Sequence, residues 1–206
     1  MALFKGATPT SLWAPLARFL ALVAAIFWSG SALAHEDHLH DAGFLTGLLH
    51  PALGFDHLLA MLSVGVLSAQ IGGRAIWTVP ATFVGVMILG SILGLNGVEV
   101  PGVEFGIATS VLVLGLVIVA YGWVPVWLAI LCVALFAIFH GHAHGTEMPL
   151  IANAWAYGAG FVLGTSLIHL AGVGIGLWSN RLTSGATVLR ALGGVVAACG
   201  LYLLVA

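Results

Sequence analysis

Charged side chains are scarce in this sequence. Its 206 residues include five lysines and arginines and seven aspartates and glutamates, so only 6% of the chain is charged. Soluble domains carry about 25% charged residues, and so few charges cannot cover a surface exposed to water. The formal net charge of −2 also gives no indication of nucleic acid as a partner. The lipid bilayer must therefore be the solvent for most of the chain.

Cysteine and the common catalytic motifs are scarce as well. Cys132 and Cys199 are the two cysteines, and both lie in apolar stretches. Buried cysteines of this kind behave as small hydrophobic side chains, so we expect neither a disulfide nor a thiolate metal site. The sequence contains no glycine-rich phosphate loop and no His-Glu-x-x-His helix. We therefore expect neither ATP hydrolysis nor enzyme activity, with an intramembrane metallohydrolase as the enzymatic alternative.

Long apolar stretches, by contrast, follow one another along the chain. A helix needs about 20 apolar residues to cross the hydrocarbon core. The pattern predicts an all-α, polytopic membrane protein with six transmembrane helices near residues 51–71, 75–95, 104–122, 125–142, 151–177 and 186–205. The breaks between these stretches are short and rich in turn-forming residues. Residues 51–206 are therefore predicted to form one transmembrane domain.

The N-terminal segment has the composition of a secretory signal peptide. Lys5 and Arg18 precede a short apolar core, and Ala32-Leu33-Ala34 has the small-x-small pattern of a cleavage site. We expect residues 1–34 to be removed, which would leave an N-terminus outside the cytoplasm. A periplasmic tail rich in histidine and acidic residues, 35–50, would then lead to the first helix. An uncleaved membrane anchor is the alternative.

The arginines agree with this orientation. With the N-terminus outside, Arg74, Arg181 and Arg190 all fall on the cytoplasmic side, as the positive-inside rule requires. The histidine and carboxylate clusters then fall at or near the outer membrane face.

Histidine is unusually frequent, with nine residues beside five lysines and arginines. The first cluster inside the predicted bundle runs from His50-Pro51 to Asp56-His57. Proline is favoured in the first turn of a helix, so we expect the chain to break at His50-Pro51 and the first spanning helix to begin at Pro51. His50 and His57 would then lie on nearly one face, two turns apart. Broken helices at membrane depth often mark ion sites.

Asp56 is the strongest single indication of function. A carboxylate within a spanning helix costs at least about 2.5–3.5 kcal/mol, so it is a functional candidate by default. It can bind a metal ion directly or orient a neighbouring imidazole. The alternative is an ion pair that only holds helices together.

The second cluster places His140, His144 and Glu147 on one face if their helix continues. His142 would point the other way, and Gly141 and Gly145 could instead loosen the helix. Imidazole with carboxylate is a ligand set typical of Ni²⁺, Co²⁺ and Zn²⁺, and the spacing does not choose among them. A solvated polar loop is the alternative reading.

Three further candidates carry weaker indications. Glu104 opens the third predicted helix, where a carboxylate either binds metal or stabilises the helix dipole. His169 stands alone in the fifth predicted helix, as a relay ligand, a proton acceptor or a packing histidine. The tail histidines that could capture metal weakly are His35, His38 and His40.

The motifs at these positions resemble the HupE/UreJ family of nickel permeases. The resemblance lies in His50-Pro51-x-x-Gly54-x-Asp56-His57-Leu58-Leu59-Ala60-Met61, in Pro101-Gly102-Val103-Glu104 through Ser110-Val111-Leu112-Val113-Leu114-Gly115, and in Phe139-His140-Gly141-x-Ala143-His144-Gly145-x-Glu147. It implies secondary uptake of Ni²⁺ across a bacterial inner membrane, supplying hydrogenase or urease maturation, with no prosthetic group. The family's key positions would match His50, Asp56, His57, Glu104, His140, His144 and Glu147.

Other functions remain open at this point. Some family members are thought to handle cobalt, so a Co²⁺ or Zn²⁺ permease is one alternative. A membrane metal sensor or assembly factor that does not transport is another. The expected partners are the divalent cation and the bilayer, and assembly as a homo-oligomer is left open.

Overall fold

The computed structural model describes residues 43–120, 124–148 and 153–206. The predicted signal peptide and the tail residues His35, His38 and His40 lie outside these ranges. Contacts divide the chain into two units, Met1–His40 and Asp41–Ala206, and the structure described below belongs to the second.

The described residues form α-helices and no strands. The helices are α2 (Phe44–Leu53), α3 (Phe55–Ile71), α4 (Ala75–Leu95), α5 (Val103–Ala120), α6 (Val126–Thr146), α7 (Ala154–Ser179) and α8 (Gly185–Val205). Five of them are long and apolar enough to cross a membrane, and the pair α2 and α3 makes a sixth candidate span that is bent by 86°. The predicted all-α membrane fold is confirmed, and its span limits fall close to the observed helices.

The start of the first span was predicted wrongly. The helix begins at Phe44 rather than at Pro51, and Pro51 lies buried in the last turn of α2. The break comes at Gly54, whose backbone is extended with φ −83° and ψ 117°. Proline removes one backbone donor from α2. Glycine at position 54 leaves room for two side chains that follow it, because a Cβ atom there would lie 3.0 Å from Nδ1 of His57 and 3.1 Å from Oδ1 of Asp56. His50 and His57 therefore lie on two helices rather than on one face of a single helix.

Glycine brings α4 and α6 into backbone contact. A Cβ atom at Gly141 would meet the carbonyl oxygen of Met87, and one at Gly145 would meet that of Ser91. Both sets of contacts advance in the same direction along the chain, so α4 and α6 run parallel. The helix α6 is continuous through Gly141 and Gly145, so the alternative in which these glycines loosen the helix does not apply.

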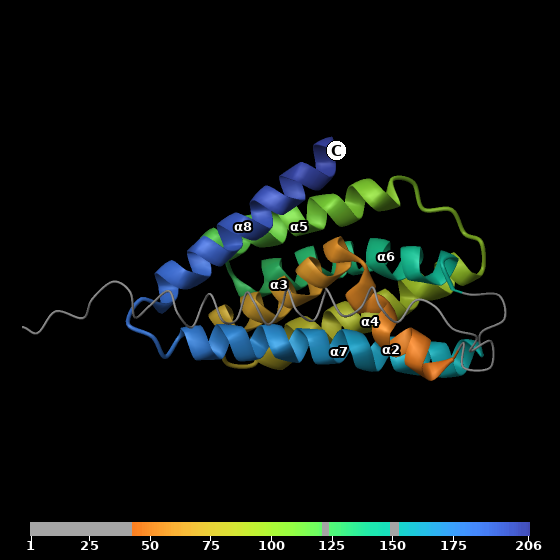
Figure 1. Cartoon of the computed structure of the whole chain (residues 1–206), viewed down its shortest axis with the longest axis horizontal. Helices are drawn as coiled ribbons and strands as arrows, with labels where there is room; N and C mark the ends of the chain where they lie inside the picture. The colour runs from red at the N-terminus through yellow and green to blue at the C-terminus, as the bar shows by residue number, and fades with distance from the viewer. Residues whose placement is uncertain (1–42, 121–123, 149–152) are drawn as a thin grey trace, which may run out of the picture. The chain divides into compact units, whose positions relative to one another are not determined.

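The helix α7 packs against α2 and α3 in the same way. A Cβ atom at Gly164 would meet the carbonyl oxygen of Leu48, and one at Gly172 would meet that of Leu62. The contacts therefore advance in the same direction along α7 as along α2 and α3. The helices α5 and α8 lie side by side and antiparallel, with Gly115 against Ala197 (Figure 1).

These directions define two ends of the bundle. Arg74 follows α3 and Arg181 follows α7, so both lie at one end, which we name the arginine end. Glu99 follows α4 and Glu147 follows α6, so both lie at the opposite, glutamate end. These arginines and glutamates thus lie at opposite ends of the bundle, as the sequence predicts.

Candidate metal site

His144, in the last turn of α6, lies at the centre of a group of histidines from three helices. Its side chain is 4% exposed, and neither ring nitrogen has a hydrogen-bond partner among the described residues. The His50 ring of α2 lies 4.9 Å from it, and the His57 ring of α3 lies 4.3 Å from it, both measured between centroids. The bend at Gly54 lets α2 and α3 each direct one imidazole at the same residue of α6.

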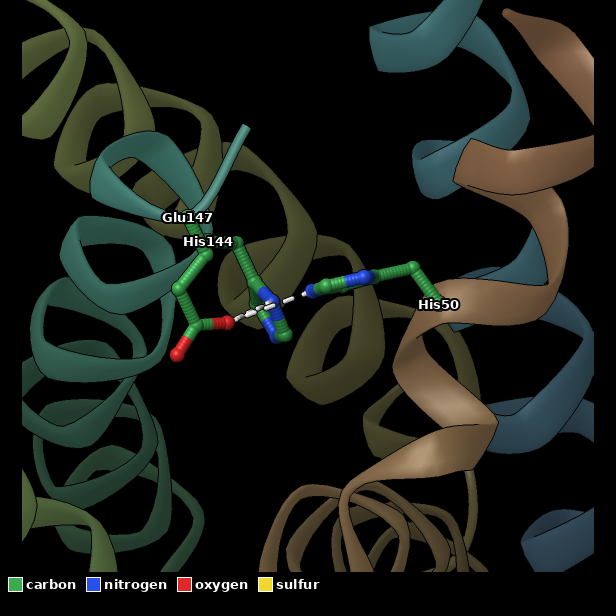
Figure 2. Close-up of side chains that lie close together, drawn as sticks. All are labelled: His50, His144 and Glu147. Atoms are coloured by element: carbon green, nitrogen blue, oxygen red, sulfur yellow. Dashed lines mark hydrogen bonds and ion pairs between the residues drawn. The ribbon is translucent and has the colours of Figure 1, made fainter. Parts of the chain in front are cut away.

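Glu147 adds a carboxylate where α6 ends. Its Oε2 atom lies 3.3 Å from Nε2 of His50, and its side chain is 51% exposed. One ligand atom from each of His50, His144 and Glu147 lies within 4.8 Å of the other two. Figure 2 shows His50 extending from α2 toward the two side chains of α6. These three residues form a group that a single cation could bind.

Asp56 acts on its immediate neighbour. Its Oδ1 atom accepts hydrogen bonds from the backbone N–H of His57 at 2.7 Å and from Nδ1 of the His57 ring at 2.8 Å. The ring proton therefore sits on Nδ1, which leaves the buried Nε2 as a free electron-pair donor without a partner among the described residues. Asp56 also occupies the first turn of α3, where a carboxylate stabilises the helix dipole. The ion pair joins residues of one helix and does not hold two helices together.

His140 extends the group toward the middle of α6. Its ring lies 4.8 Å from that of His57, and it is fully buried. The Ser110 hydroxyl of α5 donates to the carbonyl of Ile107 at 2.6 Å, so it accepts from Nε2 of His140 at 2.9 Å. The free nitrogen of His140 is then Nδ1, which is buried and unpartnered within the described structure. We call His50, His57, His140, His144 and Glu147 the histidine cluster.

Two polar residues lie apart from this cluster: His142, which the sequence predicts to lie on the opposite face of the helix, and the candidate Glu104. His142 donates from Nε2 to the carbonyl of Val98 at 2.7 Å, on the side of α6 that faces the end of α4. Glu104 is exposed in the first turn of α5 and is not among the groups whose ligand atoms converge in the described structure. His169 lies deeper along α7 and is considered below.

Sequence reasoning did not predict that two aromatic residues of α7 pack against the histidine cluster. Phe161 of α7 lies 4.4 Å from the His144 ring, and Tyr157 lies 5.8 Å from the His50 ring. Asn153 caps α7 by accepting from the backbone of Trp155 and Ala156, which fixes the turn from which Tyr157 and Phe161 project. Their spacing of one helical turn was the available signal, and it is indistinguishable in sequence from ordinary apolar packing.

Comparison with known proteins now adds to this geometry. The family model described as HupE / UreJ protein matches residues 22–203. The chain belongs to the HupE/UreJ family. A relative in this family, Protein HupE of Rhizobium leguminosarum bv. viciae, is 44% identical over 184 residues, which span 89% of this chain and 95% of the relative. No solved structure matches the chain.

Family membership fits the membrane architecture. The match covers every helix described above up to residue 203, so the HupE/UreJ assignment applies to the whole bundle. Together with the apolar helices it identifies a multi-pass membrane protein, which in bacteria belongs to the inner membrane.

Proposed function

We propose that this HupE/UreJ protein takes up a divalent transition-metal cation, Ni²⁺ foremost, across the bacterial inner membrane to supply hydrogenase or urease maturation. The observation that carries the proposal is the buried His144 ring, which has two unpartnered nitrogens and lies against His50 and His57. A buried polar group left without a partner costs about 1–3 kcal/mol. A cation bound there would remove that cost.

The donor set determines the class of cation. Neutral imidazoles with one carboxylate are suited to Ni²⁺, Co²⁺ and Zn²⁺, whereas sites made only of oxygen suit Mg²⁺ and Ca²⁺. His57 and His140 each have one ring nitrogen without a hydrogen-bond partner among the described residues, and their ring centroids lie 4.8 Å apart. The cluster can therefore replace several waters of a hydrated cation, which is the step that bilayer crossing requires.

The half-exposed Glu147 indicates the side from which the cation arrives. Its carboxylate lies at the glutamate end, whereas His140 and His57 are buried below it. We propose that the tail histidines His35, His38 and His40 collect the cation and that Glu147 and His50 receive it. The membrane potential would then favour inward movement by about 2.3 kcal/mol per charge per 100 mV. Glu104, although exposed, is retained as a ligand candidate on the family motif alone.

Purified protein in liposomes tests the transport proposal. We expect saturable accumulation of radioactive Ni²⁺ inside the vesicles, driven by an inside-negative potential and absent from vesicles without protein. Binding without accumulation would contradict transport and favour a membrane metal sensor. Co²⁺ or Zn²⁺ accumulating in preference to Ni²⁺ would assign the cargo to that ion instead.

Replacing Asp56 by asparagine should weaken Ni²⁺ uptake. Asparagine keeps the side-chain size but removes the charge that holds the His57 ring through Nδ1. Changes in residues that orient a metal-binding histidine typically cost about 10–100-fold in affinity. We expect the KM for Ni²⁺ uptake to rise by this factor, and competition by Co²⁺ and Zn²⁺ in the same assay measures whether selectivity changes too.

Glu99→Gln is the matched control for this change. It removes a carboxylate from an exposed position at the same end of the bundle and should leave the KM unchanged. Equal effects of the two variants would show that overall charge near the entrance, rather than the orientation of His57, determines uptake.

A further inference from the structure

A second group of buried side chains, three of which carry a possible metal-binding atom, lies beyond the histidine cluster. It consists of Phe83 and Met87 of α4 with Thr165 and His169 of α7, and we call it the deep cluster. Phe83, Met87 and Thr165 are 0% exposed and His169 is 1% exposed. The Phe83 ring lies 5.5 Å from the His140 ring and 5.0 Å from the His169 ring. One aromatic side chain thus contacts a histidine of each cluster.

The deep cluster is farther from the glutamate end than the histidine cluster. Along α7, His169 follows Phe161, which contacts His144, by eight residues. At 1.5 Å per residue this is a displacement of about 12 Å toward the arginine end. His144, His57, His140, Phe83 and His169 therefore form a sequence of ring contacts directed from the cluster into the bundle.

The His169 ring has the features of a metal ligand. Both of its ring nitrogens are buried without a hydrogen bond among the described residues. A histidine that served only to pack helices would be expected to bond across the interface, because unpaired buried polar atoms are unfavourable. Here Phe83 meets the ring instead, with the two ring planes 85° apart.

Two more donor atoms lie beside it. Thr165 precedes His169 by one turn of α7, so both side chains lie on one face. Its hydroxyl is directed at the Met87 sulfur, with Oγ1 and Sδ 3.9 Å apart. Imidazole nitrogen, hydroxyl oxygen and thioether sulfur form a set that binds a borderline cation more weakly than several imidazoles with a carboxylate. A weaker second site suits onward release, because conduction requires that a bound ion can also leave.

We infer that the deep cluster is a second binding station for the transported divalent cation, reached from His140 after the Phe83 ring turns aside. The inference rests on the proposed transport function. His169 is the ligand that defines the station, and Thr165 and Met87 complete it. In the structure as it stands, the Phe83 ring separates the two stations.

Replacing His169 by leucine tests the station. Leucine fills a similar space without nitrogens, so the unfolding temperature should stay equal to or above that of the parent protein. Ni²⁺ binding to detergent-solubilised protein should persist at the histidine cluster, whereas Ni²⁺ uptake into liposomes should fall by at least about 10-fold. A merely structural histidine would give the opposite combination, with a lower unfolding temperature.

His142→Leu is the control, because it also removes a buried histidine but one that is bonded to Val98. Its uptake should match the parent. A second variant, His169→Cys, returns a ligand atom at the same position. It should recover part of the uptake and show a nickel–thiolate absorption band when Ni²⁺ alone is added.

Each result decides between the alternatives. Uptake by His169→Leu within twofold of the parent, or a loss of uptake together with a lower unfolding temperature, would overturn the second station. Absence of Ni²⁺ uptake by the parent protein would instead overturn the proposed function, and the parent measurement separates the two failures.

Discussion

Replacing His144 by leucine should reduce the affinity of the protein for Ni²⁺ by about 100-fold or more, because losing a residue that only supports a ligand already costs about 10–100-fold and His144 is proposed to bind the cation directly. His144 is the residue that the rings of His50 and His57 both contact. It is also the one whose two nitrogens are both free within the described structure and next to the carboxylate of Glu147. Removing it takes away the donor that lies beside His50, His57 and Glu147.

The same substitution should not destabilise the protein. The two unpartnered nitrogens of His144 are unfavourable in the absence of metal, and leucine packs against Phe161 without them. Equilibrium dialysis with Ni²⁺ measures the affinity, and a thermal unfolding curve without metal measures stability. His142→Leu, on the same helix, is the matched control and should keep the parental affinity. A His144→Leu protein that binds Ni²⁺ as the parent does would exclude the histidine cluster as the binding site.

Gly141→Ala should produce the largest loss of stability. The added Cβ would overlap the carbonyl of Met87, and a backbone atom cannot move aside as a flexible side chain can. Overpacking a close contact typically costs about 1–3 kcal/mol and sometimes more, and here the whole of α4 must shift away from α6. We expect a clear fall in unfolding temperature in detergent. Ni²⁺ binding should also be lost, because His140 and His144 lie on α6, one of the two helices that are forced apart.

Gly85→Ala is the control for this prediction. Gly85 is exposed on α4, and a Cβ atom there would meet no other atom within 4 Å. Alanine is a better helix former than glycine by about 1 kcal/mol. The unfolding temperature of the Gly85→Ala protein should therefore be unchanged or slightly higher than that of the parent. Equal behaviour of the two alanine variants would show that α4 and α6 do not depend on close backbone contact.

The spans could be predicted from the sequence because apolar length alone determines them. α4 occupies Ala75–Leu95, as predicted, and the six-span pattern needs no knowledge of tertiary contacts. The bend was misplaced because proline favours the first turn of a helix, whereas Pro51 lies in the last turn of α2. Only the packing of α2 on α7, with Gly47 against the Tyr157 carbonyl, determines which turn it occupies.

The side chains of the histidine cluster were predicted as candidates, but their partners were not. His140 bonds to Ser110, which lies 30 residues away in the sequence, and Thr165 meets Met87, which lies 78 residues away. No local pattern encodes contacts of this range. Phe83, Phe161 and Met87 resemble any other apolar residue in a membrane helix, so sequence alone gave them no role.

The glycine contacts divide the candidate ligands between two groups of closely packed helices. His140, His144 and Glu147 belong to the pair α4 and α6, whereas His50, His57 and His169 belong to the assembly of α2, α3 and α7. Close backbone packing leaves little freedom within each group, so a small rotation of one group against the other would alter the distances between their imidazoles. Under the proposed transport function, binding of a cation between the two groups would therefore be coupled to such a rotation, and release of the ion would not require any helix to unwind.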